Sequence, residues 1–204
     1  MDSKVLETTV YYIAVMTVVC VPPGIFLWFL IHPFASFWRR LGAVATYLAV
    51  IPILVSIGAV IYYFRKPLLS IHFEINLSLF IIAVFFLAMG VYLGILRMRY
   101  LTTSMMLGMP EISRAGNSGK LLTEGIYGHI RNPRYLEIGF VLAGIALAVN
   151  YLAVYILLII YIPVIYLVVL LEEHELRKRF GDAYDRYCRE VPRFIPRLRR
   201  HSKT

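Results

Sequence analysis

The sequence predicts an all-α integral membrane protein with five transmembrane helices and a cytoplasmic helical extension at its C-terminal end. Three observations predict this fold: many apolar residues, few charged ones, and the gathering of the apolar residues into long runs. Of the 204 residues, 60% are hydrophobic and 16% are charged, whereas a soluble domain is about half apolar and about a quarter charged. Long apolar runs are typical of helices that cross a bilayer.

Five runs give the predicted helices, which cover residues 10–31, 41–64, 77–96, 133–149 and 151–180. The first run carries no charge, the second contains Pro52, and the third ends just before Arg97. The fourth and fifth runs are separated by the single polar residue Asn150, which predicts a tight antiparallel hairpin. Because no repeat or low-complexity linker divides the chain, we interpret residues 1–204 as a single membrane domain.

The basic residues fall mostly on one side of the predicted bundle. Eighteen of the 21 lie after the first, third and fifth runs, and three lie on the other side. The positive-inside rule then predicts an N-terminus outside and a cytoplasmic C-terminus, in a cell or inner membrane. The net charge of +9 is therefore a topology signal, and no nucleic-acid binding is expected. Anionic lipid headgroups are the expected partners of the basic tail, which contains Arg197, Arg199, Arg200 and Lys203.

Neither a cleavable signal peptide nor a metal site is predicted. The first residues include Asp2, Lys4 and Glu7 and so give no positive leading region. The two cysteines, Cys20 and Cys188, are expected at different depths in a reducing setting, so no disulfide is predicted either.

The connection between the third and fourth helices contains a Met-rich stretch. Met105, Met106 and Met109 surround Gly108 and Pro110. One interpretation is an interfacial flap over a lipid-like ligand, because Met adapts to irregular apolar shapes. The other is a loop that only packs.

The same connection ends in a helix start. Asn132 followed by Pro133 predicts an N-cap and the first helical position. In one interpretation this pair has only that structural role. In the other, the free N–H groups and the positive end of the helix, flanked by Arg131 and Arg134, bind a carboxylate or a phosphate.

The fifth helix ends among acidic residues. Glu172 and Glu173 are costly at the edge of the hydrocarbon unless they are paired or liganded. Together with Glu175 they either pair with the basic residues that follow at helical spacing, namely Arg177, Lys178 and Arg179, or they face a ligand. Gly181 is typical of the position after a helix end, so the helix is predicted to continue to it.

The predicted hairpin brings these two regions together. At about 1.5 Å of rise per residue, the two helices have similar lengths, roughly 27 Å and roughly 33 Å. The free ends of an antiparallel pair of similar length meet, so Asn132 and Glu172 become neighbours. An anion-binding helix start beside an acid suits a zwitterionic ligand such as an amino acid. Tyr127 and Tyr135 would be its aromatic walls.

Three segments match a known pattern. They are GIYGHIRNPRY at 125–135, EEHELRKRFGDAYDRY at 172–187 and VPRFIP at 191–196. With this spacing, the chain resembles the superfamily of isoprenylcysteine carboxyl methyltransferases and phospholipid methyltransferases over residues 119–197. The resemblance implies that S-adenosylmethionine binds at the cytoplasmic ends of the last two helices and leaves as S-adenosylhomocysteine. The first three helices match in hydropathy only.

The resemblance also implies roles for single residues. Leu121 and Leu122 would line the adenosine, Tyr127 would pack on the cofactor, Glu172 would hold its polar groups, and its methionine end would contact Asn132, Pro133, Arg134 and Tyr135. Two positions depart from the family pattern. The usual His before Pro is Asn132, and an Arg that helps to hold a prenylated substrate is replaced by Val168.

The sequence thus predicts a methyltransferase acting on a lipid-like amphiphile that enters from the bilayer. The leading hypothesis is O-methylation of an isoprenylcysteine carboxylate, with N-methylation of an aminophospholipid as the alternative. Because methyl transfer from a sulfonium needs alignment more than a strong base, Arg131 and Glu173 are proposed only to orient the acceptor. An NADPH-dependent membrane reductase and a non-catalytic membrane protein remain further alternatives.

Overall fold

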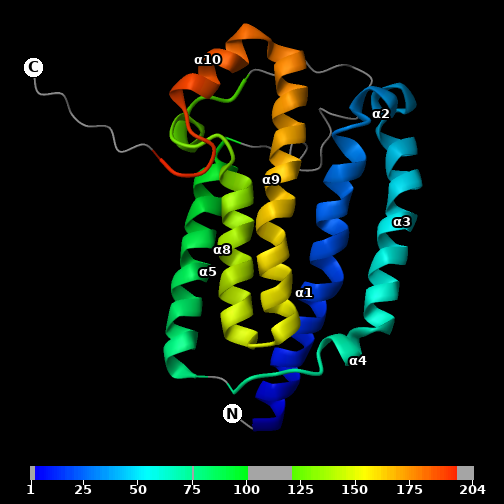
Figure 1. Ribbon diagram of the computed structural model, residues 1–204, viewed down its shortest axis with the longest axis vertical. Helices are drawn as coiled ribbons and strands as arrows, with labels where there is room; N and C mark the ends of the chain where they lie inside the picture. The colour runs from blue at the N-terminus through cyan, green and yellow to red at the C-terminus, as the bar shows by residue number, and fades with distance from the viewer. Residues whose placement is uncertain (1–2, 75, 101–120, 197–204) are drawn as a thin grey trace, which may run out of the picture.

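The computed structural model describes residues 3–74, 76–100 and 121–196, and throughout these residues the regular structure is helical. Long helices run side by side along the vertical axis of Figure 1. In chain order the elements are α1 (Ser3–Ile31), α2 (Ala35–Leu41), α3 (Ala43–Tyr63), α4 (Arg65–Leu68), α5 (Leu77–Met98), the 3-10 turn η1 (Gly125–Gly128), α8 (Pro133–Val149), α9 (Leu152–Phe180) and α10 (Asp182–Glu190).

Four helices are long and apolar enough to cross a membrane. Their candidate spans are Lys4–Ile31, Ala43–Tyr63, Leu77–Met98 and Leu152–Phe180. The helix predicted at 133–149 is present as α8 with the same bounds, but its 17 residues make it shorter than the other four. The predicted helical extension is also present, because α9 continues to Phe180 and α10 follows Gly181.

The hairpin between α8 and α9 is confirmed, and its tip is tied to a second connection. Asn150 adopts the left-handed conformation (φ 54°) and ends α8. Its Nδ2 donates to the Glu74 carbonyl at 2.7 Å, its carbonyl accepts from the Phe73 N–H at 3.0 Å, and its Oδ1 accepts from the Tyr155 hydroxyl at 2.8 Å. Asn150 is 3% exposed. The polar residue that predicted the turn therefore also joins it to the segment before α5.

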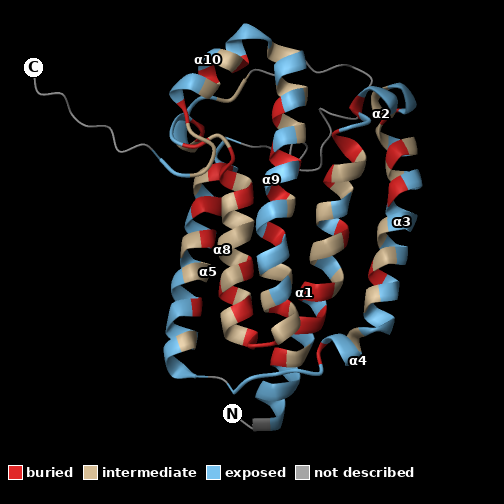
Figure 2. Cartoon of the chain, in the orientation of Figure 1, coloured by how far each residue is buried: buried red, intermediate tan, exposed pale blue. Residues whose placement is uncertain are grey.

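The buried core lies where α1, α8 and α9 face one another, while outward faces of α3 and α5 are exposed (Figure 2). α8 also packs closely on α5 through glycines. A Cβ at Gly90 would lie 2.6 Å from Cγ2 of Val141, and one at Gly144 would lie 2.9 Å from the Ala83 carbonyl oxygen. Small residues at such crossings let two helix backbones approach in a bilayer.

Replacing Gly90 with Ala is expected to destabilise the protein by about 1–3 kcal/mol, because the added methyl group overpacks the α5–α8 contact. Gly24→Ala is the matched control. No atom lies within 4 Å of a Cβ placed at Gly24, and Ala favours a helix over Gly by about 1 kcal/mol. Thermal unfolding in detergent should show a lower midpoint for Gly90→Ala and an unchanged or higher one for Gly24→Ala. Equal midpoints would show that α5 and α8 tolerate separation.

Candidate functional site

The free ends of α8 and α9 meet, as the hairpin predicted. The Tyr135 hydroxyl of α8 donates to Oε2 of Glu172 on α9 at 2.7 Å. Further along α9, the Tyr161 hydroxyl donates to the Tyr135 carbonyl at 2.6 Å. Tyr135 is thus held at both its side chain and its backbone, so the start of α8 has a fixed position relative to α9.

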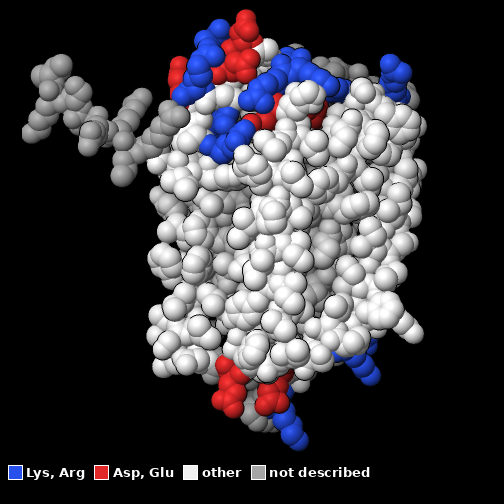
Figure 3. Space-filling view, in the orientation of Figure 1, with Lys and Arg blue, Asp and Glu red and all other residues white. Residues whose placement is uncertain are grey.

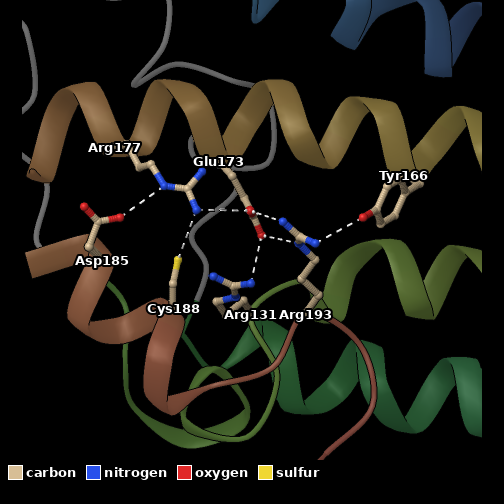
Figure 4. Close-up of polar contacts among 7 residues, drawn as sticks. All are labelled: Arg131, Tyr166, Glu173, Arg177, Asp185, Cys188 and Arg193. Atoms are coloured by element: carbon tan, nitrogen blue, oxygen red, sulfur yellow. Dashed lines mark hydrogen bonds and ion pairs between the residues drawn. The ribbon is translucent and has the colours of Figure 1, made fainter.

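Glu173 is surrounded by arginines from three parts of the chain, and Figure 4 shows this Glu173 cluster. Its carboxylate accepts from Arg193 at 2.9 and 3.0 Å. Arg131 lies 3.2 Å from Oε1, and Arg177 lies 3.8 Å from Oε2. Glu173 is 1% exposed. The hydrogen bonds that Arg193 donates to Glu173 raise the pKa of this arginine, so it stays charged.

The segment after α10 crosses over the start of α8. The backbone N–H of Arg131 donates to the Pro192 carbonyl at 2.9 Å, and that of Asn132 donates to the Arg193 carbonyl at 3.1 Å. In α10, the Tyr187 hydroxyl donates to the Tyr127 carbonyl of η1 at 2.7 Å. The three matched sequence segments therefore form one structural unit at this end of the bundle.

The helix start itself differs in one detail from the prediction. Asn132 is the N-cap and Pro133 the first residue of α8, but the Asn132 side chain caps no helical N–H. Its Nδ2 is buried without a hydrogen-bond partner among the described residues. In the first turn, the N–H groups of Arg134 and Tyr135 likewise have no partner in residues 3–74, 76–100 and 121–196. Donors for an anion are thus present at this helix end.

Tyr127 lies in the middle of this polar region. Burial raises its pKa to about 12, and charges of both signs act on its hydroxyl, from Arg97, Glu172, Arg134 and Glu137. Tyr127 is therefore neutral at physiological pH and can donate a hydrogen bond. Burial also raises the pKa of Tyr184 and of Tyr187 in α10.

Two contacts of the site were not predicted from the sequence. The Arg134 guanidinium lies over the ring of Trp28 in α1, 4.3 Å from its centroid, so the first helix positions a predicted cofactor residue. Arg97 at the end of α5 donates to Glu137 of α8 at 2.6 and 3.2 Å. The signal for the second contact was Glu137 itself, an acid inside an apolar run, which requires a partner.

The other predicted residues are placed as follows. Leu121 packs on the small apolar cluster of Tyr184, Tyr187 and Val191, and Leu122 is half-buried beside it in the chain. Val168 is fully buried, so α9 presents no cation there. The Met-rich stretch and the basic tail, with Met105, Met106, Met109, Arg197, Arg199, Arg200 and Lys203, lie outside the described residues.

A pocket of about 530 Å³ lies between η1, α10 and the segment that follows α10. His129, Arg186 and Glu190 are among its lining residues. Its lining shares Tyr187, Val191 and Pro192 with the region described above. Of the predicted cofactor residues, none lines this pocket.

A model of the phospholipid methyltransferase family matches residues 78–183, which is just over half of the chain. The matched segment begins in α5 and ends in α10, so it contains α8, α9 and the polar region at their meeting ends. No curated protein and no solved structure matches the chain.

Proposed function

We propose, because the chain belongs to the phospholipid methyltransferase family, that it is an S-adenosylmethionine-dependent methyltransferase whose acceptor is a lipid-like amphiphile. The observation that carries the proposal is the meeting of an anion-binding helix start with an acid. Arg134 and Tyr135 offer N–H groups, and Glu172 offers a carboxylate. These are the partners that an α-amino acid moiety needs.

The residues present fit this cofactor. Its carboxylate would accept from the first turn of α8 and from the buried, unpartnered Nδ2 of Asn132, and its ammonium would lie at Glu172. Tyr127 would pack on it, as the resemblance implies. When bound, the cofactor supplies a methyl group on a sulfonium. Transfer to a carboxylate oxygen breaks the S–C bond, forms a methyl ester and leaves S-adenosylhomocysteine.

Membrane placement follows from charge. Figure 3 shows a lateral surface without charged residues between two charged ends, with Lys and Arg gathered at the end that carries the site. We infer that this end faces the cytoplasm. We also infer that α8 crosses the bilayer with α9 as the fifth span, since a 17-residue helix is within the range that can cross.

The contacts of Arg131 and Glu173 favour a structural role, in which the two residues hold the parts of the site together. Both oxygens of Glu173 already bind arginines, so it orients Arg131, and Arg131 retains two buried nitrogens, Nε and Nη1, without a partner among the described residues. Their role in orienting the acceptor stays a prediction. Carboxyl O-methylation of an isoprenylcysteine remains the leading proposal and phospholipid N-methylation the alternative, and the match to the phospholipid methyltransferase family supports a methyltransferase in either case.

Glu172→Ala is expected to weaken binding of S-adenosylhomocysteine at least about tenfold, because a charge-assisted contact to the ammonium is lost. Isothermal calorimetry on detergent-purified protein measures this. Tyr135→Phe is the comparison, since it removes the hydroxyl that binds Glu172 at 2.7 Å but keeps the carboxylate, and it should have a smaller effect. If wild-type protein does not bind S-adenosylhomocysteine, or if Glu172→Ala binds it equally well, the proposal is wrong.

A further inference from the structure

The ion pair between Arg97 and Glu137 joins α5 and α8 just below η1. Nε and Nη2 of Arg97 donate to the two oxygens of Glu137. Gly94, one turn earlier in α5, makes room for the carboxylate, because a Cβ there would lie 2.9 Å from Oε1 of Glu137. Arg97 is 3% exposed, so the whole guanidinium is buried.

This arginine uses only part of its hydrogen-bonding capacity. Its Nη1 is buried and has no hydrogen-bond partner in the part of the chain that the structure describes. A guanidinium has five N–H donors, and leaving a charged donor unsatisfied away from water is costly. A purely structural pair gains nothing from such a donor, whereas a group that binds a ligand requires one.

The end of α5 lies beside the proposed cofactor site. Tyr100 contacts Gly125 in η1, where the backbone has φ +58°, so η1 is fixed against this end of α5. The charge of Arg97 acts on the Tyr127 hydroxyl together with the charges of Glu172 and Arg134. Arg97 is therefore part of the same electrostatic environment as the residues expected to hold the cofactor.

The same position also adjoins the apolar surface of the bundle. Met98, the residue after Arg97 in α5, is 66% exposed, so apolar surface begins one residue beyond the buried guanidinium. An amphiphile at this place can keep its tail against the exposed side chains while its headgroup reaches the buried guanidinium.

We propose that Nη1 of Arg97 binds the anionic group of the lipid acceptor and so selects headgroups that carry a carboxylate or a phosphate. This rests on the proposed function and adds the chemical class of the acceptor. The anion is either the carboxylate of a prenylated thioether acid or the phosphate of an aminophospholipid. Both present an oxygen to the same donor, and the charge-assisted bond fixes the headgroup beside the methyl donor.

The test measures lipid binding without turnover. Calorimetry in maltoside detergent gives the affinity of purified protein for N-acetyl-S-farnesylcysteine and for lysophosphatidylethanolamine, so the two arms identify the source of the anion. Arg97→Gln should weaken the lipid that wild-type protein binds by at least about tenfold. The methyl ester of N-acetyl-S-farnesylcysteine has no anion, so Arg97→Gln and wild-type protein should bind it with equal affinity.

Two further variants separate binding from folding. The double variant Arg97→Gln with Glu137→Gln removes both charges together, so no lone carboxylate stays buried, and it should lose the same lipid affinity. Arg99→Gln makes the same change in charge at an exposed arginine two residues away and should bind like wild type. Lipid affinity within twofold of wild type in the double variant, or no binding of either lipid by wild type, overturns the inference. If wild-type protein binds the lipid through Arg97 but does not bind S-adenosylhomocysteine, the proposed function is wrong and the lipid-binding role of Arg97 stands.

Discussion

Replacing Glu173 with Gln is expected to lower the free energy of unfolding by about 3–5 kcal/mol and to release the segment after α10. The carboxylate is 1% exposed and is the shared counter-ion of Arg131, Arg177 and Arg193. Without its charge, the buried Arg131 faces Arg193 and loses this counter-ion, whereas Arg177 still binds Asp185 at 3.1 Å. Removing one partner of a buried ion pair costs about this much.

Thiol labelling measures the release of the segment. In a Cys20→Ala background, the half-buried Cys188 of α10 should react faster with a charged maleimide when Glu173 is Gln. Glu190→Gln is the matched control, since it makes the same change at an exposed side chain. If both variants label and unfold like the parent, the Glu173 cluster does not hold the C-terminal segment.

Gly125→Ala is expected to abolish binding of S-adenosylhomocysteine. A Cβ at this position would overlap the ring of Tyr100, and the backbone has φ +58°, which an L side chain adopts only with strain. Either the end of α5 or η1 must then move. Tyr127 moves with η1, and with it the aromatic surface expected to contact the cofactor.

Gly181→Ala tests whether strain alone has this effect. Gly181 has a similar φ of +54°, but no atom lies within 4 Å of a Cβ built there. Calorimetry should therefore show retained S-adenosylhomocysteine binding for Gly181→Ala and none for Gly125→Ala. Retained binding in both variants would mean that η1 does not position the cofactor.

Local signals predicted the ends of α8 and α9 well. Pro133 and Gly181 act through the conformation of their own backbone, so their effect is visible in the sequence. The start of α1 was placed at residue 10, whereas the helix begins at Ser3. Hydropathy shows where the apolar residues begin. It does not detect helical turns made of polar residues before them.

Long-range contacts account for what the sequence did not predict. The Asn132 side chain was expected to cap α8, but it makes no cap hydrogen bond, and the carbonyls of Pro192 and Arg193 accept from the backbone N–H groups of Arg131 and Asn132. Glu173 was expected either to pair with the basic residues that follow it or to face a ligand. Arg177 does lie near it, at 3.8 Å, but Arg131 and Arg193 lie closer, at 3.2 and 2.9 Å. Neither is at helical spacing, so only the tertiary fold reveals them.

The hydrogen bonds of Asn150 have a mechanical consequence. They hold the tip of the α8–α9 hairpin against Glu74 and Phe73, so a relative tilt of the two helices would pivot at this tip. The distance along α8 from the tip to the start of the helix is about 25 Å at about 1.5 Å per residue. A tilt of about 5° thus displaces the far end by about 2 Å, which is enough to break the bond between Tyr135 and Glu172.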